Sequence, residues 1–474
     1  MFGRSSATRA LRRLVVPTRQ RLLSTMRTPA TTTYRIPNSP TKTTTRPLQP
    51  SLSSFSIRSL IRTLSTTSEP EASPYAAEFS ALLKHLQSNQ GKLDDAYWKE
   101  NILRTGKSDN PERLRYLASR LRDSIAVPKS IRPHALSLWD RALQSSELTA
   151  VARAETHTEV AIFLQQHGGD ADLDTAVVHL QQAIDAYQKE VDDGNQDATA
   201  ALAAAHMHLA LLHQQNKNWT ESLAAFTRGV RGQIAVLGIN HGAVADTYQN
   251  MGHLHGQLQQ FDQAADCYRK ALEIYKQVDG EQHASAAGAY HNLGMAIQYQ
   301  AQAVGNKDQQ ALGQFIEQAL EAMQKALQIR HTALGPTHVD TAASHMALAQ
   351  FLSQLQQPQA ADEHYQAAAD IWQALVDGGS KTPNDNEASA QPTKLSEQQM
   401  LTARRHLATV YNNKGATQHG AGKGQAALED YTKAQQALQP MFGNEEQGVP
   451  PSLMLEWAAT HNSTSSEALQ SDVK

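Results

Sequence analysis

The sequence predicts an all-α protein that is built from repeated pairs of helices. From about residue 150 onward the chain is rich in Ala, Leu, Gln and His and has few runs of β-branched residues, a composition that favours helix. In addition, residues 248–274 align without a gap with residues 345–371. Because internal repeats of this kind mark stacked structural units, we expect a helical solenoid.

The repeated unit has small residues at the places where two helices must approach each other closely. One of these small-residue positions recurs six times between residues 154 and 440, which gives six repeats. A large residue recurs at another place, which is Tyr268 in one unit and Tyr365 in another. The six small residues are Ala161, Ala210, Gly252, Gly294, Ala349 and Gly415.

This pattern resembles the tetratricopeptide repeat, in which positions 8, 20 and 27 are small and positions 4, 7, 11 and 24 are large. Gly252 is then at position 8 of the third repeat. Two of the intervals are 42 residues, longer than the usual ~34, and the lead-in segments VLGINHGAVADTYQNMG and ALGPTHVDTAASHMALA resemble the kinesin light chain subclass. The resemblance implies a right-handed superhelical solenoid of antiparallel helix pairs over residues 154–440.

Several parts of the chain depart from the repeat pattern. The insertions at 301–313 and 378–394 contain Gly, polar residues and, in the second, Pro, so we expect loops rather than helices. Lys414 stands where the sixth repeat should have a large apolar residue, and a more polar character is typical of a terminal repeat. Residues 75–148 have helical Leu spacing and predict an N-terminal helical cap or a degenerate repeat pair, while 443–474 form a polar tail.

The first 68 residues differ chemically from the rest of the chain. Residues 1–68 carry twelve Arg or Lys and no Asp or Glu, and they contain two short basic amphipathic segments, at 1–16 and 51–67. Such segments are typical of mitochondrial presequences, which are disordered before import, and an Arg-x-Leu-Ser pattern predicts a mature start near Ser65. Plastid targeting and a disordered tail that binds a membrane or nucleic acid are the alternatives.

A solenoid of this family is expected to bind peptides in a concave groove lined by the first helix of each pair. Asn recurs at position 6 as Asn250, Asn292 and Asn413, and an amide can both donate to and accept from a peptide backbone. This resembles the asparagine ladder of kinesin light chains; the alternative is that these residues are merely solvated. The predicted groove residues are Asp246, Gln249, Asn250, His253, Gln257, Asn292, Met295, Tyr299 and Asn413.

The sequence offers little for catalysis or metal binding. It has one cysteine, Cys267, and neither a Gly-rich phosphate loop nor a nucleophile or zinc motif. Its closely spaced histidines, such as His206 with His208, point to different faces of a helix. No stretch reaches the roughly 20 apolar residues of a membrane span. We therefore expect no enzyme activity, cofactor, metal, nucleic acid or small-molecule substrate.

The functional hypothesis is a non-enzymatic scaffold that binds protein or peptide partners as a mitochondrial assembly or quality-control factor, in the matrix or at the inner membrane. The alternative is a cytosolic adaptor that resembles kinesin light chain and links cargo to a motor. That family begins with a long heptad coiled coil, whereas this chain begins with a basic tract rich in Pro and Thr. A regulatory module attached to an enzyme is least favoured, because the remaining segments are short.

Overall fold

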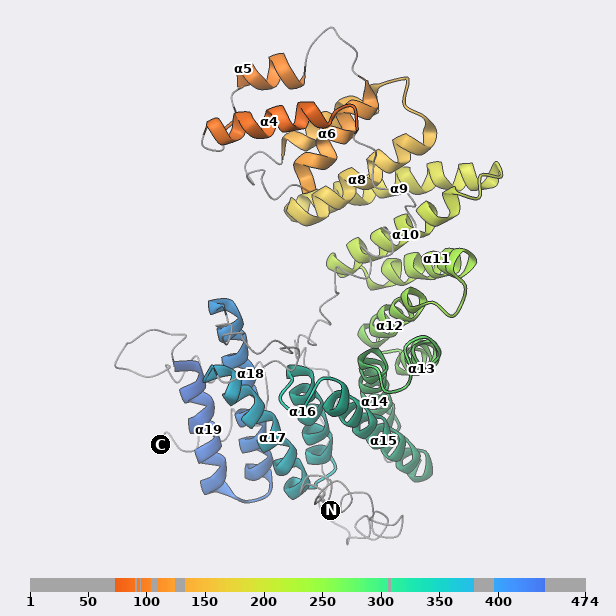
Figure 1. Cartoon of the computed structure of the whole chain (residues 1–474). Helices are drawn as coiled ribbons and strands as arrows, with labels where there is room; N and C mark the ends of the chain where they lie inside the picture. The colour runs from red at the N-terminus through yellow and green to blue at the C-terminus, as the bar shows by residue number, and fades with distance from the viewer. Residues whose placement is uncertain are drawn as a thin grey trace, which may run out of the picture. The chain divides into compact units, whose positions relative to one another are not determined.

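The computed structural model describes residues 73–89, 92–93, 95–103, 110–123, 133–305, 308–378 and 396–439, and every element within them is helical (Figure 1). The expected presequence at 1–68 and the polar tail at 443–474 lie outside the described residues. The same holds for nearly all of the expected linker at 378–394.

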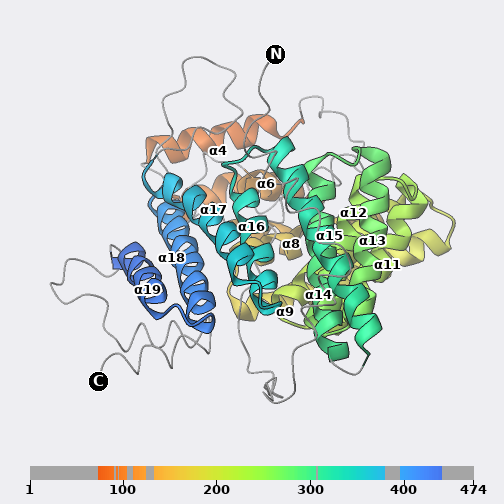
Figure 2. The same cartoon turned by 90° about the horizontal axis from the view of Figure 1, so that it is seen from below.

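The six predicted repeats are six pairs of antiparallel helices, which confirms the all-α repeat fold. The first helix of each pair packs on its second helix and on neighbouring pairs, and Figure 2 shows α16, α17 and α18 side by side. The pairs are α8 (Ala150–His167) with α9 (Asp170–Asp192), α10 (Ala198–Gln215) with α11 (Trp219–Leu237), α12 (Gly242–Gln257) with α13 (Phe261–Val278), α14 (Ala284–Val304) with α15 (Gln309–Ala333), α16 (Val339–Gln354) with α17 (Pro358–Val376), and α18 (Glu397–Gly420) with α19 (Gly424–Leu438).

The small residue at position 8 is required by the close contact within each pair. A Cβ atom at Gly252 would lie 2.7 Å from Cε1 of Tyr268, the large residue of the same repeat. At Gly415 the equivalent Cβ would lie 2.9 Å from the ring of Tyr431. These distances are shorter than van der Waals contact, so a side chain at Gly252 or Gly415 would push the two helices apart.

Three of the loops that lead into a first helix share a Gly-x-x-His device. The glycine has a positive φ angle, which a residue without Cβ adopts at little cost. The histidine is the N-cap, and its Nδ1 accepts a hydrogen bond from the backbone N–H two residues later. The pairs are Gly238 with His241, Gly280 with His283 and Gly335 with His338, and their N to Nδ1 distances are 3.2, 3.3 and 3.1 Å.

The expectation of a loop at 301–313 is wrong. Helix α14 continues to Val304 and α15 begins at Gln309, so most of this insertion lengthens the two helices of the fourth repeat. The insertion is rich in Ala and Gln, which are good helix formers, and Asp308 caps α15 by accepting from two backbone N–H groups. Nine of the thirteen residues of the insertion are therefore helical.

Residues 75–148 contain α4 (Ala76–Ser88), α5 (Asp95–Tyr97), the π-helix η1 (Trp98–Ile102), α6 (Pro111–Asp123) and α7 (His134–Gln144). Helices α6 and α7 pack together, and α6 also contacts α8. Arg115 forms an ion pair with Glu155 at 2.5 Å, and the Ser119 hydroxyl donates to Glu159 at 2.8 Å. In both pairs the two residues are 40 positions apart in the sequence. These bonds connect α6 to the first helix of the first repeat.

Lys414 is buried in the sixth pair although it replaces an apolar residue. Its Nζ atom donates to Oε1 of Gln366 at 2.8 Å and lies 3.7 Å from a carboxylate oxygen of both Asp362 and Asp430. These partners come from α17 and α19, on either side of α18. A buried ammonium group needs such compensation, and here it links the fifth repeat to the sixth.

Two glycines of α12 provide a direct test of the packing constraint. We expect Gly252→Ala to destabilise the fold by roughly 1–3 kcal/mol, because the added methyl group meets the Tyr268 ring. Gly256→Ala is the matched control: no atom lies within 4 Å of the place its Cβ would take, so it should stabilise by about 0.5–1 kcal/mol through helix propensity. Urea unfolding followed by circular dichroism measures both, and equal effects would contradict the constraint.

Candidate functional site

The candidate site is the surface formed by positions 2, 5, 6, 9 and 13 of the first helices, which we call the first-helix face. Its best-defined part lies on α12 and α14, in the third and fourth repeats. The regular spacing of these positions along a helix brings their side chains to one side. Eight of the nine predicted groove residues belong to these two helices, and the ninth, Asn413, is on α18.

A hydrogen-bonded chain of four side chains crosses this part of the face. Asn292 Nδ2 donates to Gln249 Oε1 at 3.0 Å, and Gln249 Nε2 donates to the hydroxyl oxygen of Tyr275 at 2.9 Å. The Tyr275 hydroxyl in turn donates to Asp246 Oδ1 at 2.5 Å. The chain connects α14, α12 and α13, and therefore fixes the orientation of polar groups that two repeats contribute.

Tyr275 holds this chain in place from behind the face. Its side chain is 2% exposed, and burial, followed by the nearby charge of Asp246, raises the pKa of the hydroxyl above its usual range. The hydroxyl thus keeps its proton and acts as a donor to Asp246. Because an amide has two N–H donors and a carbonyl acceptor, the single bond of Asn292 to Gln249 leaves capacity for a partner backbone.

An aromatic pair lies further along the same two repeats. The rings of Phe261, at the start of α13, and Tyr299, on α14, are stacked with centroids 4.9 Å apart and planes 16° apart. Gln300 Nε2 donates to Asp262 Oδ1 at 2.7 Å and lies 3.4 Å from the backbone oxygen of Phe261. These contacts tie the start of α13 to α14. Met295 is half-buried one turn before Tyr299.

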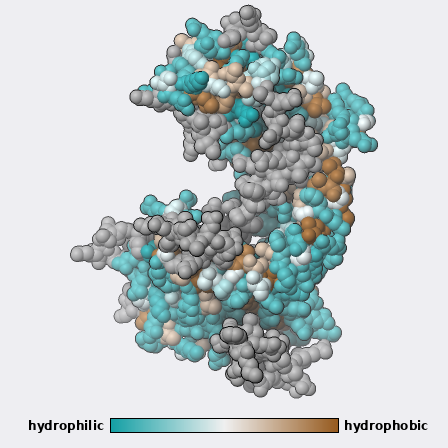
Figure 3. Space-filling view, viewed as in Figure 1, coloured by the Kyte–Doolittle hydropathy of each residue, from teal (hydrophilic) through white to brown (hydrophobic). Residues whose placement is uncertain are grey.

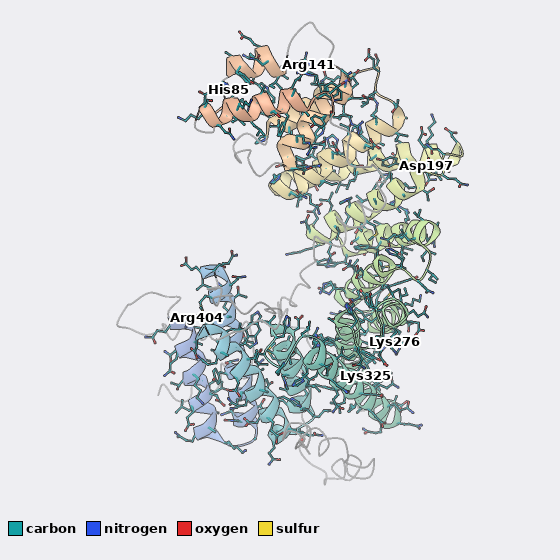
Figure 4. The ribbon with its side chains drawn as sticks, in the orientation of Figure 1. His85, Arg141, Asp197, Lys276, Lys325 and Arg404 are labelled. Atoms are coloured by element: carbon teal, nitrogen blue, oxygen red, sulfur yellow. The ribbon has the colours of Figure 1, made fainter. Side chains whose placement is uncertain are left out.

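The first helices of the central repeats carry almost no charge. Helices α10 and α14 contain no Asp, Glu, Lys or Arg, and α12 and α16 contain one acid each, Asp246 and Asp340. The second helices are charged instead: Lys276 of α13 and Lys325 of α15 lie near each other (Figure 4) and contact Glu281 at 3.7 and 2.6 Å. The hydrogen bond from Lys325 is the main cause that lowers the pKa of Glu281 to about 2.

Histidines on the first-helix face do not restore positive charge at neutral pH. Burial, followed by the charge of Arg122, lowers the pKa of His208 to about 4. Burial and then Arg330 lower the pKa of His291 to about 3, and burial alone lowers that of His253. Each of these side chains is neutral at pH 7, so the face contributes hydrogen-bonding groups rather than cations.

Two other histidine pairs lie inside repeats rather than on the face. Nδ1 of His157 is 2.8 Å from Nδ1 of His179, and Nδ1 of His345 is 2.9 Å from Nδ1 of His364. One ring of each pair must donate and the other accept, which requires that the accepting ring is unprotonated at Nδ1. Within the described residues, no three His, Cys, Asp or Glu side chains are grouped so that they could hold a metal ion. Cys267 is buried, which raises its pKa.

The structure brings only some of the predicted residues together. Asp246, Gln249 and Asn292 share the hydrogen-bonded chain, while His253 and Gln257 approach each other only to 3.5 Å. Asn250 is half-buried on α12. Asn413 is buried, and the fifth repeat, which has Ala347 at position 6, separates it from Asn292, so the described Asn residues do not form a continuous ladder.

Two functional candidates were not evident in the sequence. Tyr275 and Phe261 are on second helices, outside the positions that normally face a ligand, and no periodicity distinguishes them from core aromatic residues. Only the structure shows that the hydroxyl of Tyr275 reaches two first-helix side chains and that Phe261 lies under Tyr299. None of the described helices is long and apolar enough to cross a membrane.

The comparison with protein families supports the repeat assignment. Residues 201–277 and 309–374 match the model of the tetratricopeptide repeat. These segments contain most of α10 to α13 and of α15 to α17, so the chain carries tetratricopeptide repeats there, and this part of the resemblance is confirmed. No curated protein matches the sequence.

Several solved structures are similar to this chain. BtubC from P. vanneervenii is 21% identical with a TM-score of 0.39, over 60% of this chain and 99% of that one. A putative kinesin light chain of Podospora anserina with nearly identical TPR-like repeats is 21% identical with a TM-score of 0.38. The match covers 47% of this chain and 95% of that one. Aspartyl phosphate phosphatase F from Bacillus subtilis is 13% identical with a TM-score of 0.40. The match covers 81% of this chain and 88% of that one. These values assign no partner or activity.

The neutral histidines predict that the fold is sensitive to acid. A histidine whose pKa is lower in the folded than in the unfolded chain stabilises the fold fully above about pH 6.5, and this contribution is lost as the pH falls towards the folded pKa. Each tenfold change in proton affinity corresponds to about 1.4 kcal/mol. Ten of the histidines that the structure describes have a lowered pKa: His157, His179, His206, His208, His213, His253, His291, His345, His364 and His406.

Thermal unfolding measured from pH 8 to pH 4 checks this expectation. The unfolding midpoint should be nearly constant above pH 7 and fall steadily below pH 6.5. In the double variant His345→Gln with His364→Gln, the two side chains can still hydrogen-bond but do not titrate, so the fall should be shallower. A midpoint that does not change down to pH 4 would contradict the assignment of neutral buried histidines.

Proposed function

We propose that this protein is a non-catalytic scaffold that binds an extended segment of a partner protein along the first-helix face. The observation that carries the proposal is the fixed chain of Asn292, Gln249, Tyr275 and Asp246. It holds amide and carboxylate groups of adjacent repeats in set orientations, on central first helices whose only other charged residue is Asp340. Groups held in this way bind a peptide backbone with little further loss of side-chain entropy.

The face suits main-chain recognition better than recognition of charge. An extended peptide presents N–H and C=O groups at regular intervals, and the amides of Asn250, Asn292 and Gln249 can pair with both kinds of group. The lack of Lys and Arg on the central first helices disfavours nucleic acid and acidic chaperone tails in this position. A protein segment is therefore the ligand class that fits.

The proposal includes a location in mitochondria, in the matrix or at the inner membrane, as an assembly or quality-control factor. The support is the composition of residues 1–68, which have twelve basic and no acidic residues. The alternative remains a cytosolic cargo adaptor similar to kinesin light chains, which the 42-residue interval between Ala210, Gly252 and Gly294 favours.

Replacement of the amide side chains tests the binding face. The double variant Asn250→Ala with Asn292→Ala should weaken the binding of selected linear peptides by roughly tenfold, because two backbone-pairing groups are lost. Asn413→Ala, tested separately because the residue is buried, should have a smaller effect on the same peptides. Peptides selected from a random library displayed on phage serve as probes, and Kd is measured by fluorescence anisotropy.

The matched control is Gln277→Ala on α13, whose amide pairs with Glu273 of its own helix. It should leave both Kd and the helical circular dichroism signal unchanged. If the double variant binds every selected peptide as tightly as the unchanged protein does, the first-helix face is not the binding surface.

The location is tested by fusing residues 1–68 to a fluorescent protein. Import into mitochondria and a new N-terminus near Ser65, read by mass spectrometry, are expected. A fusion that stays in the cytosol with Met1 intact would contradict import and favour the motor adaptor.

A further inference from the structure

We infer that the stacked Phe261 and Tyr299 rings form the anchor site of the first-helix face, and that the bound segment is uncharged or basic and inserts one aromatic or large aliphatic side chain there. This inference rests on the proposed function, because it names the class of peptide that the face would take. It is carried by the exposure of Tyr299, its rigid support and the charge of its surroundings.

Tyr299 is unusually exposed for a residue of its size. Among the described Phe, Tyr and Trp side chains it is the one with large exposure, at 40%, although its ring already stacks on Phe261. The other strongly exposed apolar side chains are aliphatic, and those of α11, α13 and the loop between α11 and α12 are Val236, Ile239 and Val278. Figure 3 shows a largely hydrophilic surface with small apolar patches near α11 and α13.

The support of the ring pair is rigid. Gln300, which is 7% exposed, follows Tyr299 directly and donates to the carboxylate of Asp262, next to Phe261. The two rings are thus joined both by their own stacking and by a partly buried hydrogen bond between their neighbours. An aromatic surface that is fixed before binding loses little conformational freedom when a ligand covers it, a property shared by residues that dominate binding affinity.

The charge directly beside the ring pair is negative. Asp262 is next to Phe261 and accepts a hydrogen bond from Gln300, whereas α10, α12, α14 and α16 carry no Lys or Arg. His253 is neutral because burial lowers its pKa. An acidic segment would meet no Lys or Arg of the central first helices and would be repelled by the Asp262 carboxylate, while Lys or Arg beside the anchor would be attracted.

Selection of linear peptides from a random phage-displayed library tests this inference on the full chain. We expect the selected sequences to be enriched in Phe, Tyr, Trp, Leu or Ile at one position and to contain more Lys and Arg than Asp and Glu. The same selection on Tyr299→Ala should lose the enrichment at that position and keep the bias against acids. Tyr299→Phe keeps the ring and should select the same peptides as the unchanged protein.

One selected peptide and its variant with the anchor replaced by Ala then measure the contact itself. Tyr299→Ala should weaken the first peptide roughly tenfold and leave the Ala peptide unchanged, since only the anchor touches the ring. Val278→Ala, which removes a similarly exposed side chain from the end of α13, is the control and should change neither Kd. Circular dichroism checks that the helices are intact in every variant.

The outcomes separate this inference from the proposed function. If no peptide is enriched on any form of the protein, the proposed peptide-binding function fails. If peptides are enriched but show no anchor preference and bind Tyr299→Ala equally well, the anchor site is overturned while the proposed function stands. Enrichment of Asp or Glu would overturn the charge assignment alone.

Discussion

The close contact between the two helices of each repeat is the constraint on which the rest of the structure depends. At Gly252 and Gly415 there is no room for even one methyl group beside the facing tyrosine ring. With each pair closely packed, the first helices come to lie next to one another, joined by bonds such as that of Gln298 to Gln354 at 2.8 Å. The functional surface is thus a consequence of packing inside the repeats.

The fold was predictable from the sequence because it depends on local and periodic features. Small residues at one recurring position of the repeat identified the six pairs, and the helices described within residues 75–148 followed from Leu spacing. The error at 301–313 came from reading a short Gly and polar segment as a loop, although the surrounding Ala and Gln residues favour helix. A glycine and a few neighbouring polar residues indicate only that a turn is near. They could not show that α14 and α15 would both extend into this segment.

The candidate site was predictable only in part, because its decisive contacts join residues that are far apart in the sequence. Position numbers within the repeat placed Asp246, Gln249 and Asn292 on one face. They could not reveal that Tyr275 lies behind that face, since its role depends on how α13 is placed against α12. The same holds for Phe261, whose partner Tyr299 is on the next repeat.

Charge is divided between the two helices of the repeats in a way that separates stability from recognition. Ion pairs such as those of Lys276 and Lys325 with Glu281 join second helices and loops, whereas the central first helices carry amides, neutral histidines and two acids. Burial keeps the histidines neutral, so the uncharged character of the face follows from the same packing that holds the pairs together. In the central repeats, residues on the face can therefore determine which segment binds without contributing to these ion pairs.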